Sequence, residues 1–171
     1  MMKMKLDING EILGNSRIVI CKGDYVKKHY FQTSSFSVVQ RCTHLMKQFH
    51  PDLFVDEILT ENMLTVVMKK IDHIKPPVFD YRTNIQNYLE LYKFFGNTAA
   101  KRDLIPANIL YTGNGNEFYL IDWDHIQIFK SNSHCYQFYK EQLCDHRWQD
   151  IFQLDRSTVE NIFEEEWQNV Q

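Results

Sequence analysis

A pair of short apolar runs around a turn-rich patch places the strongest constraint on how this chain folds. The runs are residues 109–111 (ILY) and 118–121 (FYLI), and the patch between them has the sequence TGNGN. Two apolar runs around an Asn/Gly turn predict a β-hairpin. Because the strands of a hairpin are antiparallel, the residues just before the first strand and just after the second should meet at one end of it.

Three residues that can ligate a metal ion stand at that end of the predicted hairpin. Asp103 and Asn108 precede the first strand, and Asp122 directly follows the second. Their side-chain oxygens should therefore converge on one point, which suits Mg²⁺ and phosphates. A single Asp is usually a turn or capping residue. That explanation is weak here, because three polar residues fall at consistent spacing around two strands.

The same segment resembles the protein-kinase-like superfamily. Residues 101–108 (KRDLIPAN) are similar to the catalytic loop of that family, H-R-D-L-x-x-x-N, and residues 122–124 (DWD) are similar to its D-F-G metal motif. A Lys replaces the family's His at position 101, and Trp-Asp replaces Phe-Gly. The D-W form is closer to small-molecule kinases of the aminoglycoside type. Ile105 also stands where Ser/Thr protein kinases usually carry a Lys.

The resemblance implies an α+β class and a two-lobed protein-kinase-like fold, with a small antiparallel β lobe that carries one helix and a reduced, mainly helical second lobe. We expect one kinase-like domain over residues 1–171, with the first lobe over 1–70, a hinge over 71–77 and the second lobe over 78–171. A length of 171 residues suits one compact domain or two small lobes. Residues 69–77 are polar and end in Pro-Pro, so they should hold no regular element.

Strand and helix patterns in the first part of the chain fit the small β lobe. Alternation of apolar and polar residues predicts a strand over 2–8, and a further strand is predicted over 25–31. Apolar residues at helical spacing predict a helix over 36–49. A second hairpin is predicted from residues 54–59 and 63–68.

The resemblance assigns nucleotide binding to this lobe. Backbone N–H groups of the loop before residue 17 would face phosphates, at Gly14, Asn15 and Ser16. A plain hairpin turn explains this loop equally well, because a single glycine is left of a motif that usually holds three. The adenine would lie beside the backbone of the hinge, near Met68, Lys69 and Ile71.

Kinases also need a lysine on the third strand of this sheet to hold the α- and β-phosphates, and both Lys27 and Lys28 are candidates. Their side chains point to opposite faces of the strand, so only one can serve. Lys28 shares a face with Val26, which is of a size to cover an adenine, and we favour it slightly. The sequence V-K-K at this place instead favours Lys27, so the choice stays open.

The helix behind the sheet normally supplies a glutamate that pairs with this lysine. No Glu occurs between Phe36 and Pro51. Gln40 and Arg41 lie nearest to the expected place, and Gln40 could hydrogen-bond the lysine but not neutralise it. This absence is the strongest argument in the sequence against a fully active kinase.

Helical patterns dominate the second part of the chain. Apolar residues over 85–95 predict a helix that is capped by Asn84 and ended by Gly96. Residues 135–152 are predicted to be helical. Ser157 to Glu160 match a capping box that opens a closing amphipathic helix.

By the same resemblance, ATP and Mg²⁺ are the expected ligands. Asp122 would chelate the Mg²⁺ that bridges the β- and γ-phosphates, and Asn108 would hold a second one. Asp103 would accept the proton of the acceptor hydroxyl or orient it, and Lys28 (or Lys27) would grip the α- and β-phosphates. The predicted activity is transfer of the γ-phosphate to a hydroxyl of a protein or a small molecule.

Two other interpretations stay open. The second is a pseudokinase, which is a nucleotide- or partner-binding module without turnover. It fits the absence of the helix glutamate, the single glycine in the loop at residues 14–16 and the reduced second lobe. The third interpretation is a small α+β domain whose motif match is coincidental.

Composition narrows the partners and the compartment. The net charge of −3 gives no reason to expect nucleic-acid binding, and no apolar run approaches the length of a membrane span. The first ten residues lack the apolar core of a signal peptide, and the four cysteines show no framework spacing. We therefore expect a cytoplasmic protein, in a host cytoplasm if the source is a virus or a bacterial effector. The family resemblance, not the composition, implies that it binds ATP, and a protein partner or substrate is a candidate.

Overall fold

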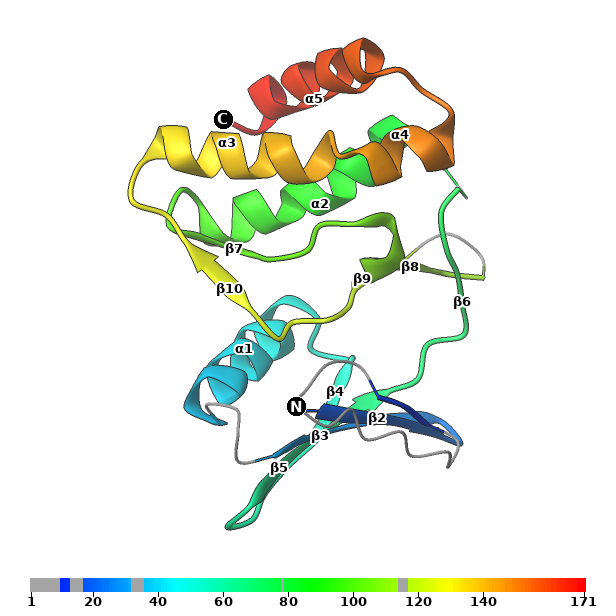
Figure 1. Cartoon of the computed structure of the whole chain (residues 1–171), viewed down its shortest axis with the longest axis vertical. Coiled ribbons are helices and arrows are strands. Elements are labelled where there is room, and N and C mark those ends of the chain that lie inside the picture. Colours follow the sequence, from blue (N-terminus) through cyan, green and yellow to red (C-terminus); the bar gives the residue numbers. More distant parts are fainter. Residues whose placement is uncertain (1–9, 13–16, 32–35, 78, 114–116) are drawn as a thin grey trace. The chain divides into compact units, whose positions relative to one another are not determined.

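The computed structural model divides the chain into two compact units, Met1–Ile71 and Asp72–Gln171. Figure 1 draws both units. The structure describes residues 10–12, 17–31, 36–77, 79–113 and 117–171. The predicted strand over 2–8 lies outside the described residues. The grouping of both units into one domain with a hinge over 71–77 stays a prediction.

A five-stranded antiparallel sheet forms the base of the first unit, in the order β1-β2-β3-β5-β4. Its strands are β1 (Gly10–Ile12), β2 (Arg17–Lys22), β3 (Tyr25–Phe31), β4 (Phe54–Leu59) and β5 (Met63–Lys69). The predicted strands over 25–31 and 54–59 are confirmed at both ends. β5 lies between β3 and β4 and is buried continuously from Leu64 to Met68.

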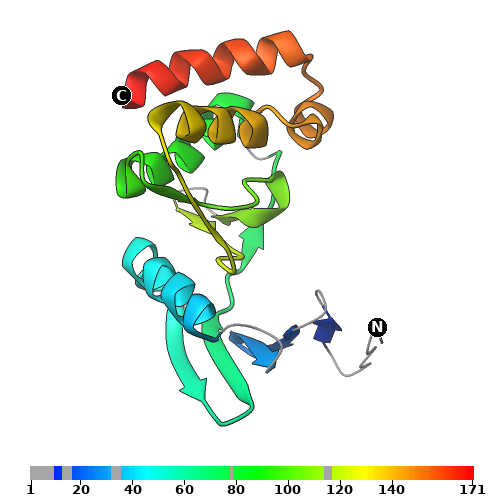
Figure 2. The ribbon, with the colours of Figure 1, turned by 60° about the vertical axis from the view of Figure 1, so that its left-hand side comes forward.

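One helix, α1 (Phe36–Phe49), packs beside this sheet and has the predicted bounds. Figure 2 shows it on the side of the sheet where it contacts β4. Its buried residues follow the helical period: Val39, Cys42, Thr43 and Met46. Gln40 lies at the edge of this stripe, and its Nε2 donates to Oε1 of Glu57 on β4, at 2.7 Å.

His50 closes this helix as a buried residue, with 7% of its surface exposed. Its backbone N–H donates to the carbonyl of Met46 at 2.7 Å, and its ring lies edge-on to Phe49. Burial lowers the pKa of His50 from 6.5 to about 4, and the carboxylate of Asp52 offsets only part of that effect. The imidazole is therefore neutral near pH 7.

We expect the free energy of unfolding to fall as the pH drops from about 7 to about 4. The unfolded chain binds a proton at His50 near pH 6.5, whereas the folded chain resists it until about 4, so acid favours unfolding. His50→Gln should flatten this part of the profile by up to about 3 kcal/mol. Urea unfolding across the range measures it, with His44→Gln on the exposed face of α1 as the matched control. Identical pH profiles for His50→Gln and the wild type would contradict a buried, neutral His50.

Two small sheets open the second unit. One has the order β6-β8-β9, from β6 (His73–Ile74), β8 (Ile109–Thr112) and β9 (Phe118–Leu120). The other pairs β7 (Ala99–Lys101) with β10 (Ile126–Ile128).

The hairpin predicted around the TGNGN patch is confirmed as β8 and β9. The prediction that residues 69–77 hold no regular element is wrong, because β6 pairs with Tyr111 and Thr112 of β8. β10 was not predicted. Strands of two or three residues are too short to show a periodic pattern, and their partners, not their sequences, define them.

Four helices complete the second unit: α2 (Tyr81–Phe95), α3 (Asn132–Leu143), α4 (His146–Phe152) and α5 (Arg156–Val170). α2 ends at Gly96, as predicted. Its start was wrong by four residues, because Asp80 is the cap and its carboxylate accepts from the N–H of Thr83 at 2.7 Å. Asn84 is instead buried inside the helix, where its amide donates to the carbonyl of Asp80.

Two further helix starts differ from the predicted ones for the same physical reason. Residues 135–152 form two helices because Asp145 accepts from the N–H of Arg147 and opens α4. Asp155, not Ser157, caps α5 by accepting from the N–H of Thr158 at 2.7 Å. In each case an Asp satisfies the unpaired N–H groups of a first turn.

α5 is held against α2 by charge and by aromatic packing. Arg82 of α2 pairs with Glu165 and with Glu166, which is buried and also accepts from Gln86. Farther along, a cluster of rings fills the space between helices α2, α3 and α5: Tyr92, Tyr136, Tyr139, Phe163 and Trp167. Figures 1 and 2 show α3 and α5 lying along α2. In the described part of the chain, no helix has the length and apolar character that crossing a membrane requires.

Candidate functional site

The candidate site lies at one end of the β8–β9 hairpin. Ile109 pairs with Leu120, and the backbone N–H of Ile121 donates to the carbonyl of Asn108 at 2.9 Å. Asn108 therefore stands opposite the residue that precedes Asp122. The structure brings these two predicted metal ligands to the same end of the hairpin.

Asn108 also connects to Asp103. Its side-chain Nδ2 donates to the carbonyl oxygen of Asp103 at 3.0 Å. The backbone N–H of Arg102 donates to the carbonyl of His125 at 3.1 Å, so the chain before Asp103 runs beside the chain after Asp122. All three predicted residues, from segments up to 19 positions apart in the sequence (122 minus 103), gather in one place.

The backbone of Asp103 and Asp122 is unusual. Their φ angles are 57° and 64°, in the left-handed region, and among the described non-glycine residues only Gln153 at the end of α4 shares this feature. This conformation costs roughly 1–2 kcal/mol for most residues and least for Asp and Asn. Strained positions cluster at functional sites, so the coincidence supports the candidate site. Asp→Asn is also the substitution that removes the charge without adding backbone strain.

Three helices hold the loop between Asp103 and Asn108 through its backbone. The hydroxyl of Tyr88 on α2 donates to the carbonyl of Ile105 at 2.6 Å. The backbone of Leu104 is held at both ends: its carbonyl accepts from Nε1 of Trp148 on α4 at 2.9 Å, and its N–H donates to Oε1 of Gln142 on α3 at 3.2 Å. Sequence reasoning missed these anchors, since Tyr88 showed only as one member of an apolar stripe.

Lys101, which stands where the kinase family has His, is completely buried. Its Nζ donates to the carbonyl of Arg102 at 2.9 Å and approaches that of Asp103 at 3.4 Å. Carbonyl dipoles help to offset the cost of burying the ammonium group. The side chains of Lys101 and Asn108 thus both contact the carbonyl oxygen of Asp103.

The two lysines of β3 lie in different surroundings. Lys28 is buried and shares its face with buried Tyr30 and half-buried Val26, whereas Lys27 is exposed on the other face. The burial of Lys28 supports the slight preference for it.

The other predicted nucleotide contacts lie at the start and the end of the first unit. Gly14, Asn15 and Ser16 lie outside the described residues. Met68 is buried in β5, Lys69 is exposed at its end, and Ile71 is half-buried beyond it. The N–H of Lys69 donates to the carbonyl of Leu53 at 2.9 Å, so this N–H is not available to adenine.

The donor set at the hairpin end fits Mg²⁺. Since Nδ2 of Asn108 is used in the bond to Asp103, its Oδ1 is the atom left to face a ligand. Together with the half-buried carboxylate of Asp122 it offers two oxygen ligands. The described residues contain no group of three His, Cys, Asp or Glu side chains that could hold a metal by themselves. Mg²⁺ needs no such group, because phosphates and water complete its shell.

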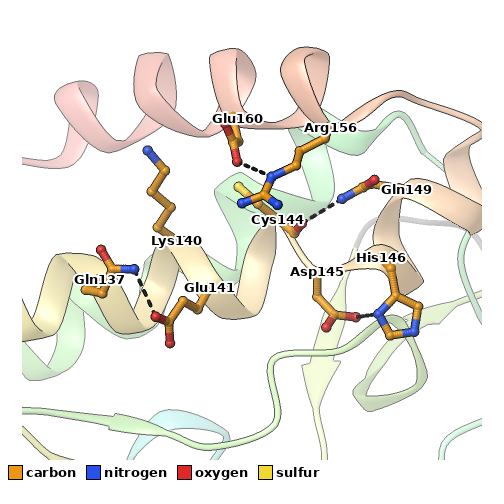
Figure 3. A pocket seen from close by; sticks show the side chains of 9 residues that line it. All are labelled: Gln137, Lys140, Glu141, Cys144, Asp145, His146, Gln149, Arg156 and Glu160. Atoms are coloured by element: carbon orange, nitrogen blue, oxygen red, sulfur yellow. Dashed lines mark hydrogen bonds and ion pairs between the residues drawn. The ribbon is translucent and has the colours of Figure 1, made fainter.

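A separate hollow of about 700 Å³ in the second unit lies where α3, α4 and α5 meet (Figure 3). Several of its charged groups already have partners: Arg156 pairs with Glu160, Lys140 with Glu164, and His146 lies beside Asp145. Burial raises the pKa of its Cys144 thiol to about 11, so this sulfur is no nucleophile near pH 7. None of the predicted site residues lines it, and we assign the chemistry to the hairpin end.

Solved structures of other proteins are similar to this chain in fold. The bifunctional kinase-methyltransferase WbdD matches with a TM-score of 0.54 at 13% identity, over 90% of this chain and 43% of that one. WbdD in a co-crystal with the kinase inhibitor LY294002 gives 0.51 at 13% identity, over 91% and 44%. The chain has a protein-kinase-like fold. The predicted α+β class and the family resemblance are thereby confirmed at the level of fold.

A second similar structure, WaaP in complex with acyl carrier protein, gives a TM-score of 0.53 at 8% identity and covers 95% of this chain and 87% of that one. The chain spans less than half the length of the WbdD chains that it matches. No protein-family model and no curated protein matches the sequence. At sequence identities of 8–13%, the similarity to these structures establishes the fold alone.

The anchors of the candidate loop can be tested by a matched pair of tyrosines. We expect Tyr88→Phe to lower the free energy of unfolding by about 1–2 kcal/mol, because the carbonyl of Ile105 loses its buried donor. Tyr139 is equally buried, but its hydroxyl has no hydrogen-bond partner among the described residues, so Tyr139→Phe should be neutral or slightly stabilising. Urea unfolding of both variants measures the difference. Equal losses would show that the hydroxyl of Tyr88 is not an anchor.

Proposed function

We propose that the protein is an ATP- and Mg²⁺-dependent phosphotransferase that moves the γ-phosphate to a hydroxyl group. One observation carries this proposal: Asp103, Asn108 and Asp122 gather at one hairpin end, with both carboxylates on left-handed backbone. The protein-kinase-like fold supports it. In this fold the catalytic loop and the metal motif occupy these positions of the chain.

The residues of the second unit have different roles in the proposed reaction: metal binding, orientation of the acceptor and positioning of the loop. The carboxylate of Asp122 would hold one Mg²⁺ and Oδ1 of Asn108 a second one, and these ions would supply positive charge to the phosphates. The exposed carboxylate of Asp103 orients the acceptor hydroxyl and takes up its proton. Lys101 and Asn108 keep the Asp103 loop in place through its carbonyl, so that little reorganisation is needed during transfer.

In this proposal the first unit binds the nucleotide. Lys28 would bind the α- and β-phosphates through its ammonium group, and the adenine would lie beside the backbone near Met68, Lys69 and Ile71. Phosphoryl transfer needs positioning and charge neutralisation more than covalent help, and this set of groups provides both.

Two classes of acceptor stay open. The D-W-D motif and Ile105 favour a small molecule, because they match the small-molecule branch of the kinases better than the protein branch. One protein of similar fold, WaaP, was solved in complex with acyl carrier protein, so a protein partner is also a candidate for this chain.

The second candidate function is a pseudokinase. Helix α1 favours it, because it has no glutamate to pair with the lysine of β3. Its Gln40 instead donates to Glu57 of β4. In that case the protein binds a partner, with or without nucleotide, and shows no turnover with any acceptor.

We expect Asp103→Asn and Asp122→Asn to fail in different ways. Asp122→Asn should lose most of the Mg²⁺-dependent part of ATP binding, by about tenfold or more, because a charged metal ligand is gone. Asp103→Asn should keep binding within a few-fold and lower turnover by about 10²–10⁴, as expected for loss of a general base. Calorimetry with and without Mg²⁺ measures binding, and release of labelled phosphate from ATP measures turnover.

Asp150→Asn, a change at an exposed position of α4, is the matched control and should leave both quantities unchanged. Turnover at the normal rate in Asp103→Asn would overturn the role of Asp103. ATP binding without any turnover in the wild type would favour the pseudokinase.

A further inference from the structure

Charge is divided unequally between the two units. Residues 1–71 contain ten Lys and Arg against seven Asp and Glu, whereas residues 72–171 contain nine against fifteen. A chain with a net charge of −3 therefore has a basic first unit and an acidic second unit. Such an asymmetry is typical of a protein whose basic part meets a negatively charged partner.

The two units also differ in what their cations contact. Five Lys and Arg side chains of the second unit form ion pairs with carboxylates: Arg82, Lys93, Lys140, Arg147 and Arg156. Four lysines at one end of the first unit's sheet are exposed and have neither an ion pair nor a side-chain hydrogen bond within the described part of the chain: Lys22, Lys27, Lys69 and Lys70. Their ammonium groups are therefore available to an external anion.

Three of these lysines surround an exposed tyrosine on one face of the sheet. Tyr25 of β3 pairs with Lys22 of β2 on one side and with Lys69 of β5 on the other. Directly paired residues point to the same face, with their Cβ atoms about 5 Å apart. Lys27 lies two residues after Tyr25 on the same strand and so shares that face. We call Lys22, Tyr25, Lys27 and Lys69 the lysine face; its tyrosine is 46% exposed.

The lysine face is separate from the candidate nucleotide contacts of the same strand. Lys28 points to the other side of the sheet, because consecutive residues of a strand alternate. That other side is the one on which α1 packs, since Glu57, which accepts from Gln40 of α1, stands in the row of Lys28. A ligand on the lysine face therefore does not compete with a phosphate held by Lys28.

Positive charge exceeds negative charge around this face. Lys70 directly follows Lys69, and its backbone N–H donates to the carbonyl of Asp24 in the turn between β2 and β3, at 2.7 Å. Two exposed carboxylates lie nearby: that of Asp24, and that of Asp56, which stands in the row of Lys27 two strands away. Four ammonium groups against two carboxylates leave a net positive surface.

The residue types favour a lipid surface over a nucleic acid. All four cations are lysines, whose compact charge attracts anions without fixed geometry, whereas arginine is the residue that recognises single phosphates through paired hydrogen bonds. Single-stranded nucleic acids are bound in grooves with several aromatic rings for stacking, and the lysine face has one ring on an open sheet. Tyrosine is enriched at the level of lipid headgroups, and clustered lysines attract anionic lipids.

We propose that the lysine face binds the first unit to an anionic lipid surface. Tyr25 lies among the headgroups, and Lys22, Lys27, Lys69 and Lys70 attract their negative charges. Each lysine near such a surface strengthens binding by a factor of about five. The contact is peripheral and reversible, and it does not depend on whether the protein transfers phosphate.

Sedimentation with lipid vesicles tests the proposal on the full chain. We expect binding to vesicles of phosphatidylcholine with about one third phosphatidylserine, no binding to phosphatidylcholine alone, and weaker binding as salt screens the charges. The double variant Lys22→Gln with Lys69→Gln should bind at least about tenfold more weakly. Lys47→Gln with Lys130→Gln removes the same charge from exposed positions elsewhere and should bind nearly as well as the wild type. Equal binding by the two double variants, or no binding by the wild type, would overturn the proposal.

The tyrosine and the alternative ligand have their own readouts. Tyr25→Ser should weaken vesicle binding a few-fold, whereas Tyr25→Trp, which keeps a ring that lies at membrane interfaces, should retain it. Fluorescence anisotropy with a labelled single-stranded oligonucleotide measures the other class of polyanion. Tight oligonucleotide binding that is lost in Lys22→Gln with Lys69→Gln, together with weak vesicle binding, would show that the face serves a nucleic acid and would refute the lipid assignment.

Discussion

The carbonyl oxygen of Asp103 is the point on which the candidate site depends. It accepts from the side chain of Asn108, and the buried ammonium of Lys101 lies 3.4 Å away. These contacts hold Asp103 at a φ of 57° that few residues adopt. The carbonyl of Asn108 in turn accepts from Ile121, so the position of Asp122 follows from the same residue. A single asparagine thus ties the loop of one carboxylate to the strand that delivers the other.

The surrounding helices fix the backbone of the loop that contains Asp103. α2, α3 and α4 each contribute one side chain to the backbone of the loop. α5 packs on α2 through Arg82 and its two glutamates. In the first unit a side-chain contact joins helix and sheet in a similar way, because Nε2 of Gln40 on α1 donates to Oε1 of Glu57 on β4.

Helices and strands long enough to show a repeating apolar pattern were predictable from the sequence. Contacts between distant segments, and the choice between neighbouring helix caps, were not. The helix over 36–49 and the hairpin before Asp122 show their patterns within one segment, so both were confirmed. The cap of α5 is Asp155 rather than Ser157 because two good caps compete and only the structure decides. The bond from Trp148 to Leu104 joins residues 44 positions apart, and no local pattern encodes it. The site residues themselves stay predictions that their geometry supports.

The most direct test of the account is to locate the metal. Paramagnetic Mn²⁺, added with ATP in place of Mg²⁺, broadens the NMR signals of nearby backbone amides. The account predicts strong, ATP-dependent broadening at Asn108 and Asp122, with the amides around Cys144 in the separate hollow unaffected. Broadening that spares Asn108 and Asp122, or broadening centred on that hollow, would contradict the claim that the hairpin end is a metal and phosphate site.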